Sequence, residues 1–127
     1  MIRSNFIKYR LPALSVALAI FIQSSLSKIP TLSLGFRMQD KLLHAIVYGI
    51  LGFLTARAFY FKTSESIKRN AFKLSFITVF LFAISDEIHQ SFVPGRSAEF
   101  GDLIADLIGM TLAQIIFFSR LGIAPLD

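Results

Sequence analysis

Apolar residues occur in four blocks along the chain rather than in amphipathic stripes. The blocks are Leu11–Leu26, Leu42–Phe61, Phe72–Ile84 and Leu103–Phe118. A helix that crosses the hydrocarbon of a bilayer needs about 20 apolar residues, with a range of roughly 17–25. The first two blocks are near that length, and the last two reach it if the polar stretch between them is partly submerged. The pattern predicts an all-α protein, a single membrane domain over residues 1–127 built as a four-helix transmembrane bundle.

Turn signals set the expected ends of the helices. Pro12 falls in the first turn of the first helix, where proline is tolerated, and Pro94-Gly95 ends the third helix. The basic stretch 62–70 is predicted to be a simple turn, and the connection 28–39 to lie in the membrane interface. The expected helices cover about residues 9–27, 40–61, 71–92 and 101–119.

Small residues recur along one side of the second and fourth helices. In membranes, small residues allow two helix backbones to approach closely. We therefore expect these ridges to be helix contacts rather than chemistry. The two ridges are Ala45, Gly49 and Gly52, and Ala105, Gly109 and Ala113.

Composition agrees with a membrane protein. Hydrophobic residues make up 54% of the chain and the mean hydropathy is +0.65. The net charge of +5 does not indicate nucleic acid, because the basic residues cluster at segment ends, as membrane anchors do. The absence of cysteine excludes a disulfide framework and a thiolate metal site. The first 26 residues resemble a signal peptide but lack a clear small-x-small cleavage site, so we expect an uncleaved helix.

The distribution of Lys and Arg predicts the orientation. Positive residues are enriched in cytoplasmic connections, so the richer side, which holds the amino terminus, the second connection and the tail, is placed in the cytoplasm. Arg57 can extend to the same face. The richer side carries Arg3, Lys8, Arg10, Lys62, Lys68, Arg69, Lys73 and Arg120, and the other side carries Lys28, Arg37, Lys41 and Arg96.

Polar residues on the predicted helices fall at two depths. At 1.5 Å per residue, the inner level lies about 20 Å from the cytoplasmic ends, and the outer level about 6 Å further out. Gln23 and Ser24 of the first helix reach the inner level. Residues four apart share a helix stripe, so these groups should face one outward-opening pocket, and charge at such depth indicates a functional site. The inner and outer members are Tyr48 with His44, Asp86 with Gln90, and Asp106 with Asp102.

Each of these residues also has a purely structural interpretation. Asp40 and Asp102 are placed where an aspartate caps a helix amino terminus. Asp86 and Asp106 lie inside predicted helices, so their structural alternative is a polar cluster that holds the bundle together. His44 and Tyr48 could be packing residues with one hydrogen bond each.

Two further polar residues lie off the main stripe. Glu87 is expected to pair with Arg96 or Lys41. His89 is expected to face the lipid headgroups.

Several motifs together resemble the VanZ-like family. They are Asp40-Lys41-Leu42-Leu43-His44 with Tyr48 and Gly52, then Asp86-Glu87-Ile88-His89-Gln90, Pro94-Gly95-Arg96, and Asp102 with Asp106 and Gly109. The resemblance implies a small multi-pass protein of the bacterial cytoplasmic (inner) membrane. It also implies a link to the cell envelope, because the family is named for a member associated with low-level resistance to the glycopeptide teicoplanin. The family often has Asn where Asp106 stands here.

Two classes of function follow. In the first, the pocket binds or acts on a membrane lipid or a lipid-linked envelope molecule, with Asp86, Glu87 and His44 as catalytic candidates. In the second, the protein is a non-enzymatic structural or partner-docking membrane protein whose polar cluster holds the helices together. Whether the protein is an enzyme stays open. The candidate ligand-binding residues are Asp40, Lys41, Tyr48, Gln90, Arg96, Asp102 and Asp106.

No nucleic acid, cofactor or resident metal is expected. A magnesium- or calcium-type site at Asp86, Glu87 and Asp106 stays open as an alternative, because hard cations prefer carboxylate oxygens. A proton or ion path is a third option. It is poorly supported, because below Asp86 the third helix offers only Thr78 and Ser75.

Overall fold

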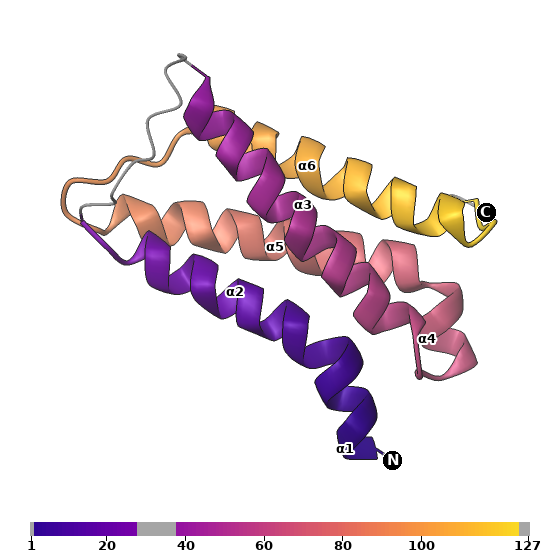
Figure 1. The fold of residues 1–127 in the computed structure, drawn as a ribbon. Coiled ribbons are helices and arrows are strands. Elements are labelled where there is room, and N and C mark those ends of the chain that lie inside the picture. The colour runs from indigo at the N-terminus through magenta and orange to yellow at the C-terminus, as the bar shows by residue number, and fades with distance from the viewer. Residues whose placement is uncertain (1, 28–37, 125–127) are drawn as a thin grey trace.

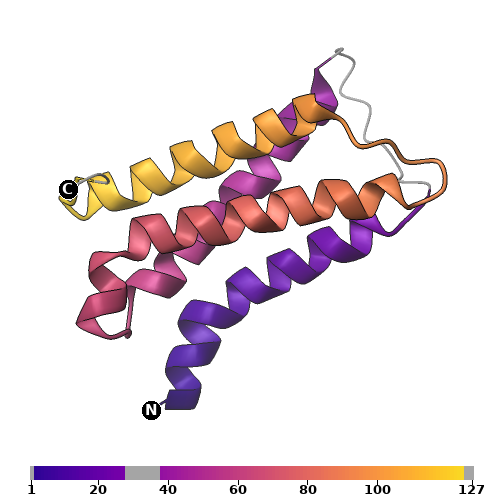
Figure 2. The same cartoon turned by 180° about the vertical axis from the view of Figure 1, so that it is seen from behind.

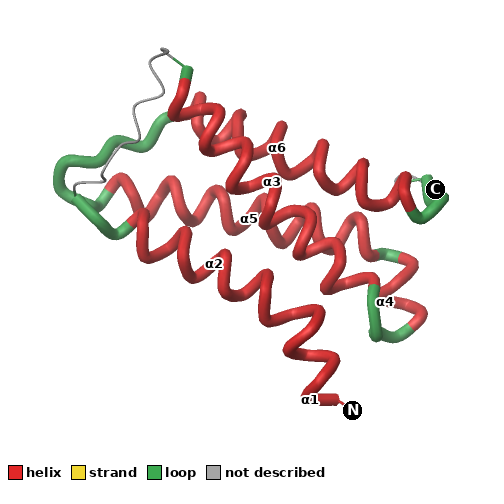
Figure 3. Tube along the Cα trace, viewed as in Figure 1, coloured by secondary structure: helices red, strands yellow, loops and turns green. Residues whose placement is uncertain are grey.

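The computed structural model describes residues 2–27 and 38–124, and every regular element in these ranges is a helix. Figures 1 and 3 show the helices as one bundle. The elements are α1 (Ile2–Asn5), the π-helical turn η1 (Phe6–Arg10), α2 (Leu11–Ser24), α3 (Gln39–Tyr60), α4 (Glu65–Arg69), α5 (Ala71–Ser91) and α6 (Phe100–Arg120).

The four long helices run alternately in opposite directions. The short α4 lies at the same end of the bundle as the start of α1 and the end of α6 (Figures 1 and 2). The loop of residues 92–99 between α5 and α6 lies at the opposite end. We call the end with α4 and the two chain termini the terminal end, and the end with the 92–99 loop the loop end.

Three of the four predicted helices begin and end within one residue of the expected positions. The predicted bounds of the first helix were wrong at both ends, because the chain is helical from Ile2 through η1 to Ser24, where residues 9–27 were expected. No glycine or proline interrupts residues 2–10, so nothing in the sequence stops the helix from extending backwards. The predicted interface segment 28–39 lies mostly outside the described residues.

Three helical stretches are long and apolar enough to cross a membrane: Arg3–Ser24, Gln39–Tyr60 and Phe100–Arg120. The α5 helix has 21 residues but does not meet the same criterion. It carries Lys73 near one end and Asp86 with Glu87 near the other, so its uninterrupted apolar part is short. The charges on α5 thus lower its hydropathy without shortening the helix.

An arginine compensates for the proline near the start of α2. Pro12 has no N–H to donate to the Lys8 carbonyl four residues earlier. Arg57 Nη1 of α3 donates to this carbonyl at 3.0 Å, and its guanidinium lies 5.0 Å from the centre of the Tyr9 ring. The cationic side chain therefore joins the first and second long helices at the terminal end.

The stretch 62–70 is more ordered than the simple turn that its composition predicted. It contains α4, a helix of one turn. Ser64 is its N-cap, and the Ser64 hydroxyl accepts a hydrogen bond from the Ile67 N–H at 3.4 Å. Serine before glutamate is a favourable helix start, a signal that the sequence carried.

Burial in this bundle is the reverse of that in a water-soluble protein. Many large apolar side chains point outward, including Leu18 of α2, Ile50 of α3, Leu81 of α5 and Leu112 of α6. A soluble monomer rarely exposes so much contiguous apolar surface. The buried polar side chains are Ser24, Thr55, Ser75, Asp86, Glu87, Gln90, Asp106 and Gln114. Apolar surroundings on all sides explain this arrangement, as hydrocarbon does for membrane helices.

The α3 and α6 helices pack against each other more extensively than any other pair. Their small residues make this possible. A Cβ added at Gly109 would collide with the backbone carbonyl of Ala45, and one at Gly52 would lie 2.9 Å from the Met110 backbone. The prediction that the small-residue ridges are helix contacts is confirmed.

We predict that Gly109→Ala destabilises the bundle, because the added methyl has no space between two backbones. Overpacking of this kind typically costs about 1–3 kcal/mol. The measurement is the thermal unfolding temperature of the purified protein in detergent. Gly49→Ala is the matched control, because its Cβ would meet the Gly109 carbonyl oxygen at 3.3 Å, which needs only a small shift. Equal stability of both variants would contradict the close-packing account.

Candidate functional site

Asp86 is the centre of a polar network that joins three helices. Asp86 Oδ2 accepts hydrogen bonds at 3.1 Å from the Tyr48 hydroxyl of α3 and from the Gln90 amide on its own helix. The same Gln90 amide donates to the Ser24 hydroxyl of α2 at 3.3 Å. Of the residues predicted at one level, Tyr48 and Asp86 are in direct contact, whereas Ser24 is connected to Asp86 through the Gln90 amide.

Arg96 closes this network from the 92–99 loop. Its Nη2 donates to Gln90 Oε1 at 2.7 Å, which places a guanidinium over the loop end of α5. The turn before it needs Gly95, whose φ of +80° suits glycine. Arg96 makes no ion pair with any described residue, so no described carboxylate uses its remaining N–H groups.

A second cluster of polar side chains joins α3 to α6. His44 Nδ1 lies 2.9 Å from Asp106 Oδ1, and His44 Nε2 lies 3.7 Å from Asp102 Oδ2. Lys41 Nζ binds Asp102 Oδ1 at 2.8 Å and Glu99 Oε2 at 3.1 Å. The i, i+4 pairing of His44 with Tyr48, and of Asp102 with Asp106, thus brings all four side chains to facing sides of their helices.

The expected ion pair of Glu87 with Arg96 or Lys41 was wrong. Glu87 Oε2 accepts a hydrogen bond from the backbone N–H of Glu99 at 3.1 Å, while Lys41 is held by two other carboxylates. The 92–99 loop folds back over α5, and this placement could not be read from helix spacing. Glu99, which ties Lys41 to this loop, was not among the predicted site residues.

The predicted capping roles of Asp40 and Asp102 were also wrong. The residues before the helices are Met38 for α3 and Glu99 for α6, and neither helix has a side-chain cap. Both aspartates lie within the first turn, where a negative charge still favours the helix dipole. Asp40 is exposed and contacts no described partner, so it lies apart from the polar groups above.

His89, which was expected to face the lipid headgroups, contacts the end of α2. Its Nε2 lies 2.9 Å from the Ser25 hydroxyl and its ring stacks on Phe21 at 4.9 Å between centroids. The contact joins α5 to the end of α2. His89 therefore serves the packing of α2 and lies outside the Asp86 network.

The Asp86 network and the His44 side chain of the second cluster border a small cavity of about 50 Å³. This space suits one or two water molecules, since a water occupies about 30 Å³ in the liquid. A lipid headgroup does not fit inside it without movement of the walls. The cavity is lined by Ile20, Gln23, Ser24, Leu43, His44, Val47, Tyr48, Asp86, Gln90 and Arg96.

Several buried polar atoms near the cavity have no hydrogen-bond partner among the described residues. They include one carboxylate oxygen on each of Asp86, Glu87 and Asp106. Gln114 lies two turns along α6 from Asp106 and is fully buried. Its amide nitrogen and oxygen also have no hydrogen-bond partner among the described residues. The sequence analysis missed Gln114, although an amide in the middle of an apolar helix was the signal that could have found it.

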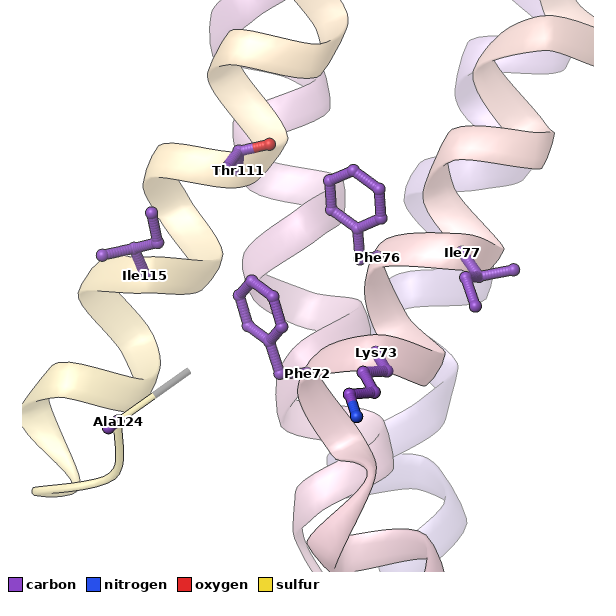
Figure 4. A pocket seen from close by; sticks show the side chains of 7 residues that line it. All are labelled: Phe72, Lys73, Phe76, Ile77, Thr111, Ile115 and Ala124. Carbon is purple, nitrogen blue, oxygen red and sulfur yellow. The ribbon is translucent and has the colours of Figure 1, made fainter. Parts of the chain in front are cut away.

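A much larger hollow lies elsewhere on the bundle. It is a groove of about 830 Å³ between α5 and α6, shown in Figure 4 with its seven lining side chains. Phe72 and Phe76 of α5 and Ile115 of α6 make its lining almost wholly apolar. This composition suits acyl chains of the surrounding membrane rather than polar chemistry, so the candidate site remains the region around Asp86.

An all-helical chain with apolar outer faces and a polar interior defines the class of a helical membrane protein. The family model described as VanZ/LLP1 matches residues 3–122, nearly the whole chain, so the protein belongs to the VanZ/LLP1 family. The resemblance found in the sequence motifs is thereby confirmed. No curated protein and no solved structure matches the chain.

We predict that Tyr48→Phe lowers stability, because it removes a donor from the buried Asp86 carboxylate and leaves the shape unchanged. Hydrogen bonds to charged groups contribute about 1.5–3 kcal/mol. Thermal unfolding in detergent measures the loss. Tyr60→Phe is the matched control, since Tyr60 makes ring contacts and no hydrogen bond through its hydroxyl to described residues. Similar unfolding temperatures for both variants would argue against the Asp86 network.

Proposed function

We propose that this chain is a single-domain, four-span membrane protein whose loop end binds the anionic headgroup of a membrane lipid or lipid-linked envelope molecule. The VanZ/LLP1 family membership and the three membrane-compatible helices support its membrane location. A cell-envelope ligand also fits the link to glycopeptide resistance that the sequence resemblance implies. The membrane in this proposal is the bacterial cytoplasmic membrane.

The observation that carries the proposal is the position of Arg96. Its guanidinium holds Gln90 Oε1, borders the cavity, and forms no ion pair with the described carboxylates. A guanidinium has five N–H donors in a fork that matches phosphate and carboxylate oxygens. An anionic headgroup at the loop end would therefore meet Arg96 N–H donors that no described carboxylate occupies.

The neighbouring side chains suit chemistry on such a headgroup. His44 is held by Asp106, and a carboxylate partner fixes the orientation of an imidazole that transfers protons. Asp86 lies across the same cavity. In the catalytic form of the proposal, His44, Asp86 and Glu87 move protons on the bound molecule, while Arg96 and Lys41 hold its charge.

A four-span topology with both termini in the cytoplasm supports a site at the outer leaflet. The polar residues of α5 near the loop end, Asp86, Glu87 and Gln90, are buried within the bundle, so α5 presents its apolar residues to lipid. Eight of the Lys and Arg residues belong to the amino terminus, the connection 62–70 with Lys73, and the tail. The positive-inside rule then assigns the terminal end to the cytoplasm.

Single-cysteine labelling tests this topology without background, because the chain contains no cysteine. Ser97→Cys lies on the 92–99 loop and should react with a membrane-impermeant thiol reagent in whole cells. Ser66→Cys lies on α4 at the terminal end and should react only after the cells are broken. The reverse labelling would overturn the assigned orientation.

Ligand binding is tested with a polyprenyl phosphate and the uncharged polyprenol of the same length, added to the purified protein with a metal chelator present. A ligand at 100 times its dissociation constant stabilises the folded state by about 2.7 kcal/mol. We expect the phosphate, and not the alcohol, to raise the thermal unfolding temperature. The increase should be lost in Arg96→Ala and largely kept in Arg96→Lys.

Arg120→Ala is the matched control for this experiment, because Arg120 is exposed at the opposite end of the bundle. It should respond to the phosphate as the wild type does. Equal responses to phosphate and alcohol, or a full response in Arg96→Ala, would refute an anion site at Arg96.

The second candidate function is structural. The hydrogen bonds of Ser24, Tyr48, Asp86 and Gln90 join α2, α3 and α5, and the contact of His44 with Asp106 adds α6. If the cluster only holds the helices together, we expect neither polyprenyl compound to change the unfolding temperature, while Tyr48→Phe should still lower it. The two candidate functions therefore give opposite results in the same measurement.

A further inference from the structure

Three potential metal ligands from three different helices converge near the cavity. They are His44 of α3, Glu87 of α5 and Asp106 of α6, and each offers a donor atom within 4.8 Å of the other two. Two of the helices are joined through the His44–Asp106 contact, while Glu87 approaches from the third. This constellation depends on the fold, because the three residues are far apart in the sequence.

The two carboxylates of this group lack sufficient hydrogen-bond donors. Glu87 is 8% exposed and Asp106 is 0% exposed, and each has an oxygen, Oε1 and Oδ2, with no partner among the described residues. A buried carboxylate oxygen without a donor costs free energy, and a bound cation removes that cost.

The basic side chains nearby do not fill this role. Lys41 is held by Glu99 and Asp102, on the side of the group nearer the loop. Arg96 donates to an amide oxygen and not to a carboxylate. Neither is paired with Glu87 or Asp106, so the two carboxylates have His44 as their nearest potential positive partner.

We propose that His44, Glu87 and Asp106 form a binding site for one divalent transition-metal ion of the Zn²⁺ class. An imidazole nitrogen and carboxylate oxygens are ordinary ligands for such an ion. Bonds of about 2.1 Å place two ligands of a tetrahedral ion about 3.4 Å apart, so donors up to 4.8 Å apart need to approach by up to about 1.4 Å. This proposal depends on the donor geometry and not on the lipid ligand proposed above.

The donor set distinguishes this site from the magnesium- or calcium-type alternative considered from the sequence. Calcium takes 6–8 oxygen ligands and magnesium retains several waters in an octahedron of oxygens. The structure places His44, and not Asp86, beside Glu87 and Asp106. Asp86 directs one oxygen to Tyr48 and Gln90 instead. A nitrogen donor with two carboxylates favours a transition metal.

The surroundings would hold these ligands in place. The Glu99 backbone N–H donates to Glu87 Oε2, which leaves Oε1 as the free oxygen of that carboxylate. Asp102 Oδ2 lies 3.7 Å from His44 Nε2 and is placed to orient the ring when Nδ1 binds the ion. With three protein ligands, one position stays open for water, as in catalytic zinc sites, and His44 also borders the cavity that has room for water.

Metal titration of the chelator-treated protein in detergent, without added lipid, tests this site. Isothermal titration with Zn²⁺ should show one ion per wild-type chain. His44→Gln and Glu87→Gln should each weaken binding at least tenfold. Mg²⁺ and Ca²⁺ at the same concentrations should show no stoichiometric binding.

The chain supplies a matched control for each variant. His89→Gln changes the second histidine, which contacts Ser25 and lies outside the ligand group. Glu65→Gln changes an exposed glutamate at the terminal end. Both controls should bind Zn²⁺ as the wild type does. Absence of stoichiometric Zn²⁺ binding, equal binding by all variants, or equally tight binding of Mg²⁺ would overturn the proposal.

Co²⁺ provides a second measurement that needs only the wild-type protein. A bound Co²⁺ with four or five ligands absorbs visible light far more strongly than the hexaaquo ion, and equimolar Zn²⁺ should abolish this absorption. If the absorption stays that of the hexaaquo ion, the proposed site is refuted even if the variants fail to fold. Because the lipid experiment contains chelator and this one contains no lipid, each proposal can fail independently of the other.

Discussion

The contact between the backbones of α3 and α6 determines where the polar side chains of this protein lie. Gly109 packs on the Ala45 carbonyl, and His44 and Asp106 lie immediately beside this contact on the same two helices. With larger residues at these ridges the helices would separate, and a distance of 2.9 Å between His44 Nδ1 and Asp106 Oδ1 could not be kept. The contact between His44 and Asp106 thus depends on the close backbone packing of α3 against α6.

The buried polar side chains around Asp86 reduce the cost of their burial by bonding to one another. In hydrocarbon an unpaired polar group costs several kcal/mol. The Asp86 network meets this demand by sharing, since one carboxylate oxygen serves both Tyr48 and Gln90, and the Gln90 amide serves both Asp86 and Ser24. One carboxylate oxygen on each of Asp86, Glu87 and Asp106, and both amide atoms of Gln114, have no partner among the described residues, and of these four side chains Asp86 lines the cavity.

The sequence alone predicted the long helices and many of the polar side chains that lie together near the loop end. It did not predict which of these side chains pair with each other. Helical periodicity placed Tyr48 level with Asp86, because the rise per residue is constant along a helix. It could not place Glu87 or Lys41, since their partners depend on the path of the 92–99 loop. The early start of the first helix was missed because Pro12 suggested a beginning there, while the compensating contact from Arg57 comes from a residue far along the chain.

The wall of the cavity formed by α2 has a consequence for access. Ile20, Gln23 and Ser24 close one side of the cavity, yet α2 packs far less extensively on its neighbours than α3 does on α6. Arg57 and Arg10 fasten the first helical stretch at the terminal end, whereas Ser24 and Ser25 hold the other end through single hydrogen bonds to α5. The α2 helix is therefore the wall of the cavity with the fewest contacts to its described neighbours, so separating it from α5 would break fewer contacts than separating α3 from α6.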